Sequence, residues 1–207
     1  MQMNKLTQIT TTIAVLLPSI SSAQIIMDYT TTVKVNEVEL VQSVAANQLE
    51  KLIAKPAQKI KKEYSECTAN YEYSTSFPNG KTLKFEIFSE DNPQIKSENF
   101  YKTKYNFQQL GLTQGRVWLS WNNTQSLTEK VLVNGKHINN QYTFNQFKKD
   151  FPLSAKTGNS VLMLSNPEVK SYLKNPNDYT AGYTAYVHFE FKHGKLSQLE
   201  INQAIAC

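Results

Sequence analysis

Arginine is almost absent from this sequence. Arg116 is the sole arginine among 22 basic residues, and the formal net charge is +5. Proteins that read nucleic acids or single phosphate groups rely on the planar guanidinium of arginine, which lysine lacks. We therefore expect no nucleic-acid partner, and we interpret the positive charge as a solvated, lysine-rich surface.

Catalytic and cofactor-binding motifs are absent as well. No G-x-S-x-G, H-E-x-x-H, P-loop or dinucleotide-binding motif occurs. The candidates for a base or a metal ligand are His137, His188 and His193, and neither of the last two has an Asp or Cys at metal-ligand spacing. The sequence predicts a protein that is not an enzyme, with no catalytic residue, no cofactor and no metal site.

Carboxylates leave one alternative open. Glu86, Glu190 and Glu200 fall on the polar phase of expected strands, where a glycosidase-type pair of carboxylates could form. A secreted hydrolase with an unrecognised site is therefore the alternative to a protein without catalytic activity.

No apolar run reaches the roughly 20 residues that a membrane-spanning helix needs. The run from Ile13 to Leu17 follows the positive charge of Lys5, and Ser21 and Ala23 place small residues where signal peptidase cuts. Residues 1–23 are thus predicted to be a cleaved signal peptide, with an ordinary buried helix as the alternative. The protein is expected in the periplasm or the extracellular medium, without stable membrane insertion.

Only two cysteines occur, Cys67 and Cys207. An exported protein meets an oxidising compartment, and an even number of cysteines there indicates a disulfide. A metal pair or a reactive thiol is the alternative, but neither cysteine has a His or Cys neighbour at ligand spacing. We therefore predict a Cys67–Cys207 bridge.

Two stretches with the same order of patterns lie 98 positions apart. Residues 32–35 alternate as a half-buried strand does, and residues 45–53 carry apolar residues at helical spacing. Residues 131–133 form another strand, and residues 143–151 combine capping-box spacing with phenylalanines at helical spacing. The identical pairs are Val33 and Val131, Val35 and Val133, Asn36 and Asn134, Asn47 and Asn145, Gln48 and Gln146, and Lys51 and Lys149.

Each helical pattern is followed by alternating strands around a tight turn. These runs are residues 71–87 around Asn79-Gly80 and residues 183–201 around His193-Gly194. Such dipeptides supply the positive φ angles of a hairpin turn. The second half has additional residues before its hairpin, and we expect them among residues 157–179.

We predict an α+β fold that is mostly β with few helices, built of two tandem modules. Each module is a strand, a helix and an antiparallel meander, over residues 24–127 and 128–207. Residues 100–127 should add one or two strands, and the Cys67–Cys207 bridge should close one compact unit. Chance is the alternative to an internal duplication, because six matches in a chain rich in lysine and asparagine are few.

Tandem strand–helix–meander modules in a small exported bacterial protein resemble, in outline, the β-lactamase inhibitor proteins. The likeness rests on architecture, covers most of residues 30–205 and includes no diagnostic motif, so it assigns no residue. It implies a class of proteins that cover the active site of another protein.

Two aromatic residues are candidates for a partner-binding surface. Along residues 117–121, alternation places Trp118 on the face opposite its apolar neighbours, and Tyr186 points outward by the same reasoning. Exposed tryptophan is often found at the centre of protein interfaces. Burial of both side chains under residues 157–179 is the alternative.

The sequence favours an exported binding protein that inhibits or neutralises a partner enzyme, as an inhibitor or an immunity protein does. An envelope assembly or accessory factor is the second possibility, and the secreted hydrolase is the third. Basic residues between Lys51 and Lys62 could also meet an anionic membrane surface or an acidic partner, although a solvated helix face explains them as well. The sequence leaves the oligomeric state undetermined.

Overall fold

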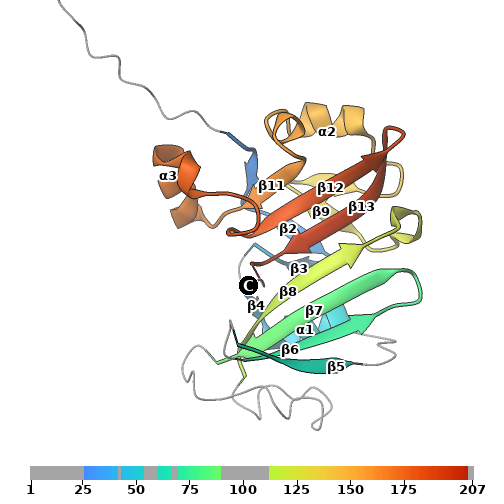
Figure 1. The fold of residues 1–207 in the computed structure, drawn as a ribbon, viewed down its shortest axis with the longest axis vertical. Helices are drawn as coiled ribbons and strands as arrows, with labels where there is room; N and C mark the ends of the chain where they lie inside the picture. Colours follow the sequence, from blue (N-terminus) through green and yellow to red (C-terminus); the bar gives the residue numbers. More distant parts are fainter. Residues whose placement is uncertain (1–25, 42, 54–59, 67–69, 90–111, 205–207) are drawn as a thin grey trace, which may run out of the picture.

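Strands dominate the structure. The computed structural model describes residues 26–41, 43–53, 60–66, 70–89 and 112–204. Within these residues many β-strands are accompanied by three α-helices (Figure 1), which confirms the expected mostly β, α+β class. The predicted signal peptide, residues 1–23, and both cysteines, Cys67 and Cys207, lie outside the described residues.

A nine-stranded sheet joins the two halves of the chain. Its order is β1-β11-β12-β13-β8-β7-β6-β5, and β4 also pairs with β8. All its pairs are antiparallel except that of β1 with β11. The strands are β1 (Tyr29–Thr30), β4 (Val44–Ala45), β5 (Lys61–Ser65), β6 (Asn70–Ser76), β7 (Lys81–Phe88), β8 (Gln114–Trp121), β11 (Ser160–Met163), β12 (Tyr186–Lys192) and β13 (Lys195–Asn202).

A smaller sheet and two helices cover one face of the large sheet (Figure 1). The small sheet has the order β10-β9-β2-β3. Its valines share one hydrophobic core with the buried side chains of β7, β8, β12 and β13. The elements are β2 (Val33–Val35), β3 (Val38–Glu39), β9 (Val131–Val133), β10 (Lys136–Ile138), α1 (Ala46–Ile53) and α2 (Phe144–Asp150).

Alternation along β8 separates the core from the surface. Val117, Leu119 and Trp121 have no solvent exposure, as the sequence predicted. Trp118 and Ser120 point to the opposite side of the sheet and are half-buried. The sheet therefore has one face packed in the core and one face that carries polar and aromatic side chains.

The start of α2 confirms the predicted capping box. The Thr143 hydroxyl accepts a hydrogen bond from the Gln146 amide, and the Gln146 side chain accepts one from the Thr143 amide. Phe147 then packs with its ring centroid 4.7 Å from that of Phe189 on β12. The cap fixes where the helix begins, and the aromatic contact fixes which face it buries.

The two predicted turns differ in construction. Lys192 and Lys195 pair across a two-residue turn in which His193 and Gly194 have φ angles of 52° and 74°, as predicted. In the turn after β6 only Gly80 has a positive φ, 81°. The proline before Asn79 holds its own φ negative, so this turn needs three residues instead of two.

Two hairpins missed in the sequence share their geometry. Asn36 and Asn134, which lie 98 positions apart, both begin their turns with positive φ angles, 48° and 50°. The Asn36 amide donates to the Lys130 carbonyl at 3.0 Å, and the Asn134 amide donates to the Thr32 carbonyl at 2.9 Å. A shift of 98 positions converts one of these hydrogen bonds into the other, with the two halves of the chain exchanged. The strands next to these bonds, β2 and β9, pair with each other in antiparallel orientation.

The segment 157–179 contains a strand and a helix that the sequence did not reveal. They are β11 and α3 (Asn166–Lys174). Tyr172 of α3 is fully buried, and its hydroxyl donates to the Met27 carbonyl while accepting from the Met27 amide. This contact helps hold β1 beside β11. Three-residue 3-10 helices connect the elements at η3 (Thr124–Ser126), η4 (Ser154–Lys156) and η5 (Pro176–Asp178).

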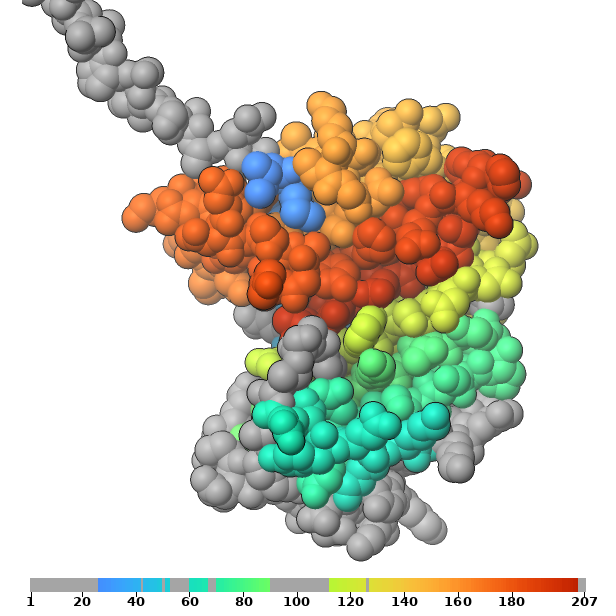
Figure 2. All heavy atoms as spheres, viewed as in Figure 1, coloured from blue at the N-terminus to red at the C-terminus, as the bar shows by residue number. Residues whose placement is uncertain are grey.

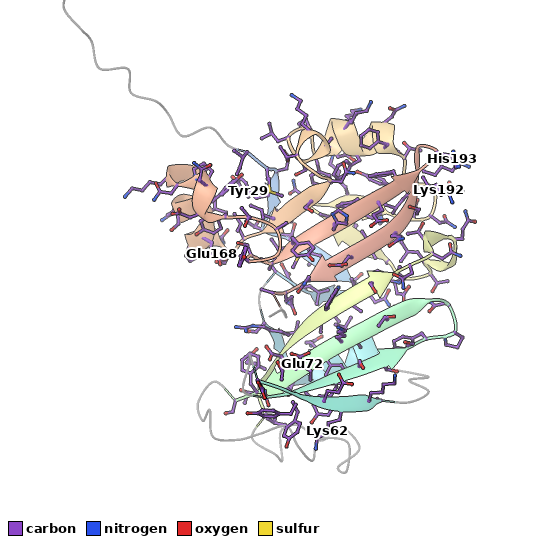
Figure 3. All side chains as sticks on the ribbon, in the orientation of Figure 1. Tyr29, Lys62, Glu72, Glu168, Lys192 and His193 are labelled. Atoms are coloured by element: carbon purple, nitrogen blue, oxygen red, sulfur yellow. The ribbon has the colours of Figure 1, made fainter. Side chains whose placement is uncertain are left out.

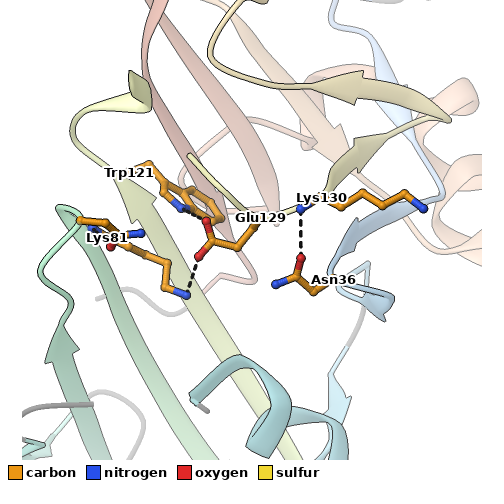
Figure 4. A network of polar contacts seen from close by, with 6 residues as sticks. Asn36, Lys81, Trp121, Glu129 and Lys130 are labelled. Atoms are coloured by element: carbon orange, nitrogen blue, oxygen red, sulfur yellow. Dashed lines mark hydrogen bonds and ion pairs between the residues drawn. The ribbon is translucent and has the colours of Figure 1, made fainter. Parts of the chain in front are cut away.

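A buried ion pair connects β7 of the first half to Glu129, just before β9 of the second half (Figure 4). Lys81 Nζ lies 2.9 Å from Glu129 Oε1, and both side chains are about nine-tenths buried. The indole N–H of Trp121 donates to the other carboxylate oxygen at 3.1 Å. Burial alone would raise the pKa of Glu129, but the hydrogen bonds and charge of Lys81, with the Trp121 bond, bring this pKa below its usual value.

Gly115 of β8 allows α1 to lie directly on the sheet. A Cβ atom at this position would be 2.7 Å from Leu49 Cδ2 and 3.0 Å from the Glu86 carbonyl oxygen. Gly115→Ala should therefore displace α1 and lower the free energy of unfolding by about 1–3 kcal/mol, as measured by urea denaturation. Together with Leu49→Ala the loss should be smaller than the sum of the two single losses, and simple additivity would contradict this contact.

Candidate functional site

The uncovered face of the large sheet is the candidate site. We call it the open face, and it faces the viewer in Figure 1. Most of its side chains are half-buried or exposed, although Asn202 and Ser160 are buried, and the side chains on the opposite side of the same strands form the core. Figure 2 shows strands β12, β13, β8 and β7 side by side on this surface. At its centre the open face consists of Lys84, Trp118, Ser120, Tyr186, His188, Glu200 and Asn202.

Trp118 and Tyr186 lie in one row across three strands. Asn202 of β13 pairs with Trp118 of β8 on one side and with Tyr186 of β12 on the other. Residues in register across a sheet point to the same face. The structure thus brings the two predicted partner-binding residues together, on either side of a single asparagine.

Tyr186 is held in place by hydrogen bonds. Its hydroxyl donates to Glu200 Oε1 at 2.5 Å and accepts from Asn202 Nδ2 at 3.5 Å. Burial, followed by the hydrogen bond to the Glu200 carboxylate and its charge, raises the pKa of Tyr186 to about 12. At neutral pH the Tyr186 side chain is therefore a neutral phenol that two hydrogen bonds hold in position.

The ammonium group of Lys84 lies over the ring of Trp118. Lys84 of β7 is its cross-strand neighbour, and Lys84 Nζ lies 4.4 Å from the ring centroid. This cation–π contact orders a large aromatic surface. The Trp118 indole N–H is buried and has no hydrogen-bond partner in the part of the chain that the structure describes.

The open face also contains a serine–histidine pair. Ser160 Oγ lies 2.8 Å from His188 Nδ1, and His188 Nε2 lies 4.0 Å from Glu190 Oε1. Ser160 is 6% exposed. A nucleophilic serine needs an accessible oxygen and a base oriented by a third group within hydrogen-bond reach. In this structure Ser160 is buried and Glu190 lies beyond hydrogen-bond distance of His188, and the pair joins β11 to β12.

Arg116 lies on β8, two residues before Trp118. It is paired with Glu86 of β7 through one contact of 3.4 Å, and its side chain is 48% exposed while that of Glu86 is 5% exposed. Burial raises the pKa of Glu86, the charge of Arg116 lowers it, and the nearby Glu72 carboxylate raises it again. The net shift is upward. The ion pair leaves the outer part of the guanidinium open to a partner.

A cavity of about 480 Å³ adjoins this end of the open face. Arg116 lines it together with Tyr179 and Tyr183 of the loop before β12. Tyr183 is 92% exposed, the highest value among the exposed large apolar side chains of the described residues. This end of the sheet thus contains Tyr179, Tyr183 and Arg116, next to the row of Trp118, Asn202 and Tyr186.

The other residues singled out in the sequence do not form a site. His137 and His193 are exposed on other elements, and no cluster of metal-ligating side chains is found within the described ranges. Lys51 lies in α1 whereas Lys61 and Lys62 lie in β5, so these basic residues do not share one helix. No pattern in the sequence indicated the exposure of Tyr183 or the position of Arg116, although the rarity of arginine distinguishes that residue.

None of the described helices is long and apolar enough to cross a membrane. Comparisons with protein-family models, with curated protein sequences and with solved structures find no match for this chain. The side chains of the open face are therefore the basis for assigning a function.

Proposed function

We propose that this is an exported binding protein that inhibits or neutralises a partner enzyme, and that the enzyme docks on the open face. The observation that carries the proposal is the row formed by Trp118, Asn202 and Tyr186, with Arg116 beside it. Tryptophan, tyrosine and arginine are the residues most often responsible for the binding energy of protein interfaces. Here they come from neighbouring strands of a rigid sheet, which lowers the entropy cost of binding.

We also propose that the fold arose from two tandem modules. The hydrogen bonds of Asn36 and Asn134 are equivalent under a shift of 98 positions, and α1 and α2 begin 98 positions apart, at Ala46 and Phe144. The last strands of the two meanders, β8 and β13, pair at the centre of the sheet. This arrangement supports the outline resemblance to the β-lactamase inhibitor proteins and makes the open face a surface shared by both modules.

Export and the disulfide belong to the same proposal. If residues 1–23 are removed and Cys67 is joined to Cys207, the secreted protein should begin at Gln24 and contain no free thiol. Mass spectrometry of the intact protein should give a mass lower by two hydrogens than that of the reduced chain from Gln24 to Cys207. Recovery of the full chain, or labelling of either cysteine by a thiol reagent under denaturing conditions without reductant, would contradict this prediction.

Two other functions have weaker support. An envelope accessory factor would use strand pairing, and β5, at one edge of the large sheet, has exposed Lys61, Glu63 and Tyr64. Charged residues on an edge strand usually prevent pairing rather than invite it. A glycosidase-type hydrolase would need two free carboxylates of Glu86, Glu190 and Glu200, but Glu86 is paired with Arg116 and Glu200 accepts a hydrogen bond from the Tyr186 hydroxyl.

The partner can be captured with matched variants. Purified protein is immobilised beside a Trp118→Ala/Tyr186→Ala variant and a Leu173→Ala variant, whose altered side chain is 47% exposed on α3. We expect an enzyme from the cell envelope or from secreted proteins to be retained by the wild type and by Leu173→Ala, and to be lost from the double variant. Equal recovery by all three proteins would place the binding surface elsewhere.

A further inference from the structure

Lysines of like charge face each other at the turn between β12 and β13. Lys192 and Lys195 are in register, both are exposed, and His193 and Gly194 form the turn between them. Figure 3 shows Lys192 and His193 at the outer end of this hairpin. Like charges directly opposite each other destabilise a strand pair. Fold stability therefore does not explain this pair.

Helix α2 brings further lysines to the same end of the sheet. The Phe144 amide donates to the Gly194 carbonyl at 3.0 Å, so the start of α2 contacts the turn. Lys148 lies one helical turn later, with Nζ 5.1 Å from the Phe144 ring centroid. Lys149 follows it, and both lysines are exposed. We call the resulting group the basic tip, which comprises Lys148, Lys149, Lys192, His193 and Lys195.

The basic tip has no acidic partner of its own. Among the described residues, none of its four lysines takes part in an ion pair. Asp150, the only carboxylate of α2, is already engaged by Lys136 at 3.3 Å and by the Tyr142 hydroxyl at 2.9 Å. Glu190 faces Gln198 on the open face. The positive charge of the tip therefore remains available.

We propose that the basic tip binds the headgroups of an anionic lipid surface. Lys192 and Lys195 belong to the open-face side of the hairpin, whereas α2 packs on the covered side through Phe147 and Phe189. A protein seated on the open face would meet Lys192 and Lys195, whereas an extended surface in front of the turn would also meet Lys148, whose Nζ lies over the ring of Phe144 beside the turn. The lysine ammonium group is a point charge and lacks the two parallel donors with which arginine binds a single phosphate. It therefore suits a diffuse array of headgroups better than one bound phosphate. The proposal is independent of the partner enzyme.

Vesicle binding tests this proposal directly. The probes are vesicles of phosphatidylglycerol and phosphatidylcholine in equal parts, and vesicles of phosphatidylcholine alone, in cosedimentation at low salt. The K192Q/K195Q variant should bind the anionic vesicles about 30-fold more weakly than the wild type, because each lysine near such a surface contributes about a fivefold gain. The variant should fold normally, since it removes a repulsive pair, and thermal unfolding checks this.

The matched control is K170Q/K174Q, which removes the same charge from two exposed positions of α3. It should weaken binding less than about threefold, through long-range charge alone. Equal weakening by both double variants would overturn the proposal, as would equal binding to neutral vesicles. Binding to polyglutamate without binding to anionic vesicles would assign the tip to an acidic protein and would overturn it too.

Discussion

Glu129→Ala should lower the free energy of unfolding by about 3–5 kcal/mol. The change leaves Lys81, whose side chain is 10% exposed, without its counterion, and it removes the acceptor of the Trp121 N–H. Glu129 thereby joins the start of β7 and the end of β8 to the beginning of the second half of the chain. Chemical denaturation at neutral pH measures the loss.

An exposed pair provides the control for Glu129→Ala. Lys130 and Glu37 are 3.1 Å apart, but their side chains are 54% and 72% exposed. Glu37→Gln should therefore change stability by no more than about 0.5 kcal/mol. Adding Lys81→Met to Glu129→Gln should restore part of the stability lost in Glu129→Gln, because the lone buried charge is then gone. A double variant as unstable as the sum of its parts would show that the two groups act independently.

The same ion pair predicts a pH dependence. Because the folded protein lowers the pKa of Glu129, its carboxylate stabilises the fold fully above the unfolded pKa of about 4.3, and this contribution is lost as the pH falls through the lower folded pKa. The stability difference between the wild type and Glu129→Gln should be constant from about pH 5 upward and should shrink below about pH 4. A difference that grows in acid would contradict the assignment.

Trp118→Ala should weaken binding of the partner enzyme by about 30-fold or more, because truncation of a central interface tryptophan typically costs at least about 2 kcal/mol. The side chain is half-buried and lies under Lys84 Nζ, so the variant should lose only about 1 kcal/mol of folding stability. Titration calorimetry and urea denaturation measure the two quantities. A large loss of stability with unchanged affinity would make Trp118 a structural residue.

Tyr186→Phe distinguishes the contribution of the Tyr186 hydroxyl from that of its ring. The phenylalanine keeps the aromatic surface and removes the bond to Glu200. If the ring makes the contact, the affinity for the enzyme should fall much less than in Tyr186→Ala. Similar losses in both variants would indicate that the phenol itself, positioned by Glu200 and Asn202, contacts the partner.

Local patterns in the sequence predicted the elements whose boundaries are set by a few neighbouring residues. The capping box of Thr143 fixes the start of α2, and His193-Gly194 fixes the turn between β12 and β13, so both are local consequences of side-chain chemistry. Strand β11 is different. Its four residues are all buried, so it shows no alternation, and its position depends on β1 and β12 on either side.

The arrangement of the open face could not be predicted because it depends on strand register. Alternation placed Trp118 and Tyr186 outward, but only the pairing of β8 with β13 and of β13 with β12 places Asn202 between them. Lys81 is a further case. Its position in the polar-looking start of β7 gave no indication that it would be buried against Glu129, 48 residues later.

Inhibition of the captured enzyme by the purified protein tests the central proposal most directly. Enzyme activity is titrated with the wild type, with Trp118→Ala/Tyr186→Ala and with Leu173→Ala. We predict that activity falls in proportion to added wild type until the two proteins are equimolar, that Leu173→Ala behaves alike, and that the open-face variant leaves the enzyme active. Full activity at a saturating excess of the wild type, or equal inhibition by the open-face variant, would contradict inhibition through this face.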